Sequence, residues 1–167
     1  ITSPELILYI AVPPSGEPLS ADGAWVKSGA KPTISISLIP GSGNGALASK
    51  QKLKNITVNL PSEQTSMWTI VPNVEANVPC WDLIATATNK HILSPSEPLQ
   101  ITLGNIMSDN TVVPGETWLT VMASNVPGYN DRTFFQSIDK IAPTPSILGF
   151  SADQTHIVAG QKVRLSW

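Results

Sequence analysis

The clearest alternation of apolar and other side chains falls in two stretches, residues 98–104 and 116–124. One face of the first stretch carries Leu99, Ile101 and Leu103, and one face of the second carries Leu119, Val121 and Ala123. A repeat of two residues places alternate side chains on opposite faces of a β-strand. Both stretches are therefore predicted to be strands with one face buried. The segment between them contains Ser108-Asp109-Asn110 and Pro114-Gly115, which favour turns.

The remainder of the chain offers more strands and almost no helix. Short apolar or alternating segments predict strands at residues 6–12, 33–39, 54–60, 81–88 and 133–138. Glycine-rich residues 40–45 contain Asn44-Gly45, a pair that favours the positive φ angles of hairpin turns. Prolines interrupt residues 61–80, where we expect one helical turn at most.

This pattern predicts an all-β fold. Strands that alternate apolar and polar residues need one buried and one solvated face, and two stacked sheets supply both. An antiparallel β-sandwich is therefore expected.

The character of the sequence changes near residue 142. Pro143 and Pro145 predict a stiff, extended linker at residues 142–145, after a sandwich domain that covers residues 1–141. An apolar segment then ends near Phe150, and a glycine turn precedes Val163–Trp167. Residues 146–167 resemble the first strands of a bacterial immunoglobulin-like or fibronectin-like module. The resemblance implies an immunoglobulin-like sandwich, followed here by the truncated start of a second one.

The composition of the chain limits the classes of partner that it can bind. The chain has 167 residues, 13% of them charged, and a net charge of −2. This balance leaves no basic surface for nucleic acid, and no apolar run of about 18 residues is present to insert into a membrane. Lys50, Lys52 and Lys54 form the densest basic group, interpreted as one face of a solvated edge strand rather than a binding patch. Because the chain starts at Ile1 and stops at Trp167 within a strand pattern, we expect a piece of a larger bacterial surface or secreted protein.

Candidate catalytic and metal-binding residues are few. His91 and His156 stand far apart in polar, turn-like segments, and the single cysteine, Cys80, lies between Pro79 and Trp81 as a small buried residue would. The chain lacks the spacing motifs of hydrolases, metalloproteases and phosphate-binding loops. Asp109-Asn110 or Asn130-Asp131 offer oxygen ligands for calcium, but both pairs are also ordinary turn residues. We expect no enzymatic activity, no cofactor and no metal.

Two classes of function remain. The first is a structural or interaction module that contacts neighbouring modules of the same chain or a protein ligand. The second is a carbohydrate-binding module, because sugar sites on sandwiches use exposed aromatic rings. The candidate contact residues are four tryptophans: Trp25, Trp68 and Trp81, expected in or beside loops, and Trp118, expected on an outer face. The alternative for each of them is packing in the core or against a neighbouring module.

Overall fold

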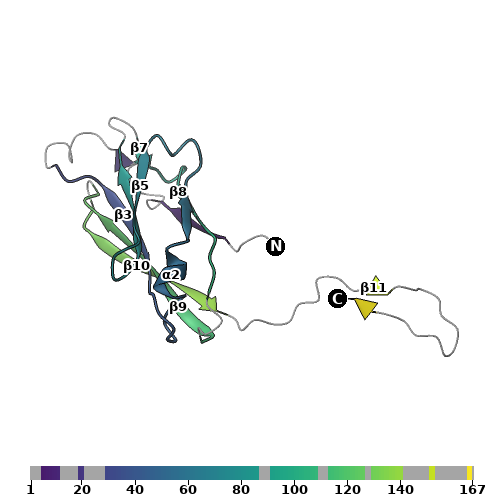
Figure 1. Ribbon diagram of the computed structural model, residues 1–167. Helices are drawn as coiled ribbons and strands as arrows, with labels where there is room; N and C mark the ends of the chain where they lie inside the picture. The colour runs from purple at the N-terminus through teal and green to yellow at the C-terminus, as the bar shows by residue number, and fades with distance from the viewer. Residues whose placement is uncertain are drawn as a thin grey trace, which may run out of the picture.

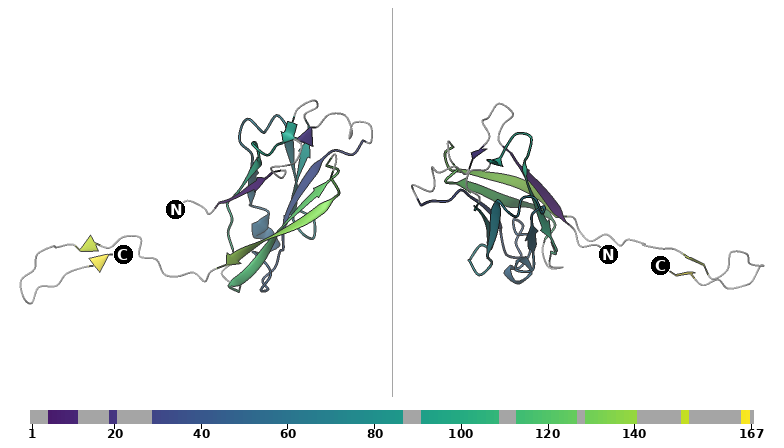
Figure 2. Two further views of the ribbon diagram at one scale, coloured as in Figure 1. Left: turned by 180° about the vertical axis from the view of Figure 1, so that it is seen from behind. Right: turned by 90° about the horizontal axis from the view of Figure 1, so that it is seen from above.

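The computed structural model describes residues 5–11, 19–20, 29–86, 91–108, 113–126, 129–140, 151–152 and 165–166. Two antiparallel sheets stack face to face in it, as Figure 1 and the further views of Figure 2 show. The predicted all-β antiparallel sandwich is thus confirmed. Within the described residues, no helix is both long enough and apolar enough to cross a membrane.

The larger of the two sheets, here the large sheet, has five strands in the order β10-β9-β3-β6-β5. Their bounds are β3 (Thr33–Leu38), β5 (Trp68–Asn73), β6 (Cys80–Ala85), β9 (Gly115–Ser124) and β10 (Arg132–Lys140). The small sheet opposite it has the order β1-β8-β4, with β1 (Leu6–Ile10), β4 (Thr57–Asn59) and β8 (Leu99–Gly104). The long strands β9 and β10 run side by side along one margin of the sandwich (Figure 1).

The core lies between the sheets and follows the alternation that predicted it. On β3 the side chains of Ile34, Ile36 and Leu38 are buried, whereas Ser35 and Ser37 on the other face are half-buried. Leu99, Ile101 and Leu103 of β8 face them from the small sheet and are also buried. Burying such aliphatic side chains supplies roughly 1.5–3 kcal/mol each. The two predicted strands on either side of residues 105–114 are β8 and β9, and they belong to different sheets.

The lysine-rich segment differs from its prediction. Residues Lys50–Leu53 form the short helix α2, so the three lysines do not lie along one face of a strand. Leu53 anchors this helical turn in the core, because its side chain is fully buried. Two of the lysines contact Glu75 instead. Lys54 Nζ lies 2.7 Å from Glu75 Oε1, and Lys50 Nζ donates to the Glu75 carbonyl.

Strand β5 was also not expected, because Pro72 interrupts its pattern. A proline cannot donate to a neighbouring strand and is tolerated at the edge of a sheet. Strand β5 occupies that position, since it pairs with β6 alone among the described strands. The turn at Pro40–Gly45 is present, but its positive φ falls at Gly41 rather than at Asn44-Gly45.

Two short pairs complete the described structure. Strand β2 (Leu19–Ser20) pairs with β7 (His91–Leu93), which places His91 at the start of a strand rather than in a turn. Strand β11 (Ser151–Ala152) pairs with β12 (Leu165–Ser166) in the segment after the expected linker. The linker at residues 142–145 lies outside the described residues.

Candidate functional site

The four candidate tryptophans do not gather in one place. Trp68 opens β5 and Trp81 lies on β6, and each is only 2% exposed. Both residues thus lie at the start of a strand, beside a loop, and their burial is the core packing given as the alternative, which leaves neither ring open to a ligand. Trp118 lies on β9 and is 40% exposed, as its opposition to Leu119 predicts. Trp25 lies outside the described residues.

Trp118 belongs to an exposed apolar group on the outer face of the large sheet. Trp118 is paired with Ser137, Thr120 with Phe135, and Met122 with Thr133. Phe135 is therefore a diagonal neighbour of both Trp118 and Met122, within reach of aromatic side chains. Phe135 is 65% exposed and Met122 is 43% exposed. We name these three residues, Trp118, Met122 and Phe135, the outer patch.

The outer face continues across β3 and β6 with polar groups. Ser35 Oγ donates a hydrogen bond of 2.6 Å to Asp82 Oδ1, and Cys80 lies two positions before Asp82 on the same face. Partial burial, followed by the charge of Asp82, raises the pKa of the Cys80 thiol. The thiol is therefore neutral at physiological pH, which is the opposite of what a cysteine nucleophile requires.

A second surface lies at the open side of the sandwich, between β1 of the small sheet and β10 of the large sheet. A cleft of about 400 Å³ separates these strands. Its walls come from β1, β3, β9 and β10: Leu8, Tyr9, Ile10, Ala11, Ile34, Val121, Ala123, Phe134, Phe135 and Gln136. None of these residues is charged. We name this feature the edge cleft.

Phe134 defines the edge cleft. It is paired with Val121, which is paired in turn with the buried Ile36, so Phe134 lies on the inner face of the large sheet. An inner-face phenylalanine is normally covered by the opposite sheet, yet Phe134 is 54% exposed. Among the described strands, the small sheet has three and ends at β1, so the five-stranded sheet extends beyond it.

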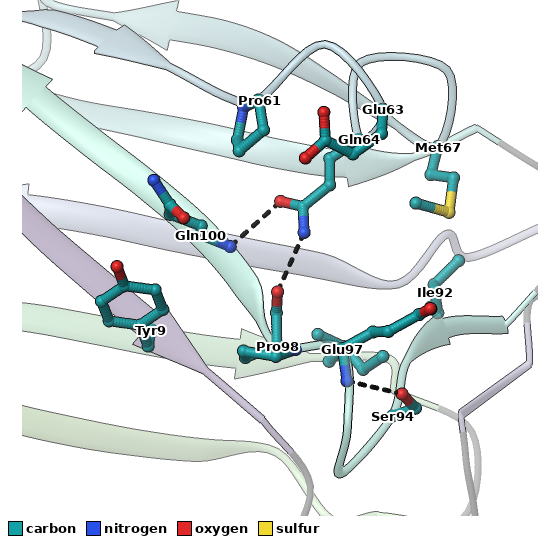
Figure 3. A pocket seen from close by; sticks show the side chains of 11 residues that line it. Tyr9, Pro61, Glu63, Gln64, Met67, Ile92, Ser94, Glu97, Pro98 and Gln100 are labelled. Atoms are coloured by element: carbon teal, nitrogen blue, oxygen red, sulfur yellow. Dashed lines mark hydrogen bonds between the residues drawn. The ribbon is translucent and has the colours of Figure 1, made fainter.

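A polar pocket of about 390 Å³ lies on the other side of β1 (Figure 3). Tyr9 and Gln100 are paired across β1 and β8, and the turn at residues 61–67, the end of β7 and the loop at residues 94–98 form its walls. Its charged lining residues are Glu63 and Glu97. No ion pair with either carboxylate is present within the described part of the chain.

Gln64 links two walls of this pocket by hydrogen bonds. Strand β4 ends at Asn59, opposite Thr102, so it leaves the rest of β8 unpaired on that side. The side-chain amide of Gln64 bonds to the backbone there instead. Its Nε2 donates to the Pro98 carbonyl at 2.9 Å, and its Oε1 accepts from the Gln100 N–H at 3.0 Å (Figure 3). One side-chain amide thus replaces a strand at this end of the small sheet.

The structure describes only some of the candidate calcium and catalytic residues. Asp131 Oδ1 accepts a hydrogen bond from the Asn125 N–H at 2.9 Å and so closes the turn between β9 and β10. Asp109, Asn110 and His156 lie outside the described residues. Among the residues that the structure does describe, no three His, Cys, Asp or Glu side chains gather as metal ligands would.

Sequence reasoning missed the phenylalanines, although a signal for them exists. Phe134 and Phe135 are consecutive, and consecutive residues of a strand point to opposite faces. One of the two rings must therefore face outward once the segment is predicted to be a strand. The edge cleft and the polar pocket each combine segments far apart in the chain, which no local pattern reveals.

No family model, no curated protein and no solved structure matches this chain.

Proposed function

We propose that this chain is a non-catalytic interaction module of a larger surface or secreted protein, and that it makes its contacts through β9 and β10. The observation that supports this is the concentration of exposed apolar side chains on these two strands. Trp118, Met122 and Phe135 lie on one face and Phe134 lies on the other. Contiguous exposed apolar groups on a soluble domain mark contact surfaces.

The chemistry of these residues favours a protein partner. Aromatic and methionine side chains are enriched at the centres of protein interfaces, and charged side chains are depleted there. The outer patch contains no charge, and its paired neighbours Thr120, Thr133 and Ser137 are polar but neutral. The acidic residues Glu116 and Asp139 are paired at the margin of the patch on the same face, so an apolar centre is bordered by polar and charged groups, as in a protein interface.

A display library tests this proposal even when the partner has not been identified. Random dodecapeptides are selected against the immobilised protein, and each selected peptide is then bound to the double variant Trp118→Thr/Phe134→Ser. The proposal expects most of the selected peptides to lose binding to this variant. Peptides that bind it unchanged, and instead lose binding to Glu63→Ala/Glu97→Ala, would move the interaction surface to the polar pocket.

A carbohydrate-binding module is the second candidate, on one observation. Trp118 is exposed on the outer face of the large sheet and has Phe135 diagonally beside it, so two rings are available for stacking on sugars. Titration of the ¹⁵N-labelled protein with soluble cello-, xylo- and chito-oligosaccharides tests this candidate. Shifts confined to β9 and β10 and abolished by Trp118→Ala support it, and an unchanged spectrum with all three sugars counts against it.

A further inference from the structure

Strand β10 presents a long free edge. It has nine residues, and among the strands that the structure describes it pairs only with β9. At the free side of such a strand, backbone N–H and C=O groups of alternate residues have no partner strand. Natural sheets shorten, bend or charge their edges to prevent pairing with other chains. The middle of β10, Thr133–Ser137, contains no charge and no proline.

The edge cleft lies directly beside this free edge. Phe134 and Gln136 of β10 form one wall, Leu8 and Ile10 of β1 form the other, and Ile34 lies at the base. A strand added to β10 on this side would place every second side chain into the cleft. The two features together fit an extended polypeptide better than a folded surface or a small polar ligand.

We propose that the edge cleft binds an extended segment of a partner protein, which adds to the large sheet as a further strand beside β10. This inference rests on the proposed function and names the kind of partner. Strand addition draws its affinity from backbone hydrogen bonds and its specificity from pockets for alternate side chains. Here the free edge of β10 supplies the backbone hydrogen bonds, and the edge cleft supplies the pockets for alternate side chains.

The charges of β10 define the sequence of the added segment. The inner-face residues at its centre are Phe134, Gln136 and Ile138, and the inner-face residues at its ends are Arg132 and Lys140. An antiparallel partner therefore needs uncharged apolar residues at three alternate central positions and an acidic residue at each end. Like charges directly opposite on paired strands are unfavourable, and opposite charges are favourable.

The same charges argue against a second copy of this chain as the occupant. Two β10 strands related by a twofold axis pair over their full length only when Gln136 lies opposite itself. Arg132 then lies opposite Lys140 at both ends of the ladder, which brings cations together. Other registers shorten the ladder. A strand from a different protein, with acidic ends, can pair over the full length of β10 without placing like charges opposite each other.

A designed peptide tests the proposal on the whole chain. The acetylated and amidated peptide Glu-Thr-Val-Thr-Val-Thr-Val-Thr-Glu carries a fluorescent label, and its binding is followed by anisotropy. Hydrogen–deuterium exchange then reports on the backbone of β10. A control peptide has the same side chains but N-methyl groups on alternate residues, so that its backbone cannot donate to a strand. Phe134→Ser and Met122→Ser form the matched protein pair, because both side chains are exposed and apolar but Met122 lies on the outer face and does not line the edge cleft.

The proposal expects binding of the first peptide only, together with slowed exchange at the alternate β10 amides that do not bond to β9. It also expects Phe134→Ser to weaken binding about tenfold, and Met122→Ser to weaken it less than about twofold. Equal binding of the N-methylated peptide, equal effects of the two variants, or a dimer of the protein alone in sedimentation would each overturn it. If library peptides nevertheless depend on Trp118, strand addition fails while the proposed interaction function stands.

Discussion

Phe134 and Phe135 are consecutive residues of β10, yet they lie on opposite faces of the large sheet and both are more than half exposed. Phe134 lines the inner face, where the small sheet no longer covers it, and Phe135 completes the outer patch with Trp118 and Met122. One strand thus presents aromatic rings on both faces and a free backbone edge between them. This combination gives β10 its proposed role in contacts.

The Gln64 side chain should matter for stability although it lies in a turn. Gln64→Ala leaves the Pro98 carbonyl and the Gln100 N–H without their partner, and both bonds are partly buried. We expect a loss of about 1–3 kcal/mol in the free energy of unfolding, measured with urea. Glu63→Ala is the matched control, because Glu63 is the exposed neighbour of Gln64. Equal stability of the two variants would show that the Gln64 bonds contribute nothing.

Gly115 should tolerate no side chain. Its φ of +141° is a conformation that other residues rarely adopt, and an added Cβ would lie 2.5 Å from Asn44 Oδ1. Gly115→Ala should therefore lower the free energy of unfolding by about 1–3 kcal/mol. Gly43 offers the control, because a Cβ there meets no atom within 4 Å. A Gly43→Ala variant as unstable as Gly115→Ala would contradict this assignment.

Lys140 should stabilise the end of β10 through its ammonium group. Its Nζ donates to the Asn44 carbonyl at 2.8 Å and to the Ala46 carbonyl at 2.6 Å, so it ties the last residue of the strand to the turn after β3. Lys140→Met keeps much of the apolar stem and removes both bonds, at an expected cost of about 1–3 kcal/mol. Thermal unfolding measures the loss, and Asp139→Asn, an exposed neighbour, should remain within about 0.5 kcal/mol of the parent protein.

The Cys80 thiol should react slowly with alkylating reagents. Burial and the charge of Asp82 raise its pKa above the ordinary value of 9.0, so the folded protein holds the proton at a pH where the unfolded chain releases it. The resulting stabilisation is full below the unfolded pKa and is lost as the pH rises from that value through the higher folded pKa. Iodoacetamide at pH 8.5 should label the native protein more slowly than the urea-unfolded protein.

A substitution of Asp82 separates the effect of its charge on the Cys80 pKa from the effect of burial. Asp82→Asn eliminates the charge but retains an oxygen that can accept from Ser35. The variant should alkylate faster than the parent protein in the native state and at the same rate when unfolded. Unchanged native labelling would assign the raised pKa to burial alone.

The fold could be predicted wherever one face of a strand is buried throughout. The alternation in β3, β8 and β9 follows from this burial, and the structure confirms it in Ile36, Ile101 and Leu119. The pattern failed at α2, because alternate lysines also suit one short helical turn anchored by Leu53. It failed at β5 because Pro72 is compatible with a strand only at a sheet edge, and edge position is a property of the whole sheet.

The candidate site was less accessible to sequence reasoning. The outward position of Trp118 followed from its opposition to Leu119, and the structure confirms it. Trp68 and Trp81 both lie at the start of a strand, beside loops, and only the three-dimensional structure shows that both rings are buried in the core. The edge cleft depends on the difference in size between two sheets, which becomes visible only when strand order is known.

The central claim is that the aromatic residues of β10 serve contact rather than folding, and the unfolding free energy of Phe135→Thr tests it most directly. Leu119→Ala, in the same sheet but fully buried, provides the scale and should cost about 2–5 kcal/mol. The account predicts that Phe135→Thr stays within about 0.5 kcal/mol of the parent protein. A loss for Phe135→Thr as large as that for Leu119→Ala would contradict it.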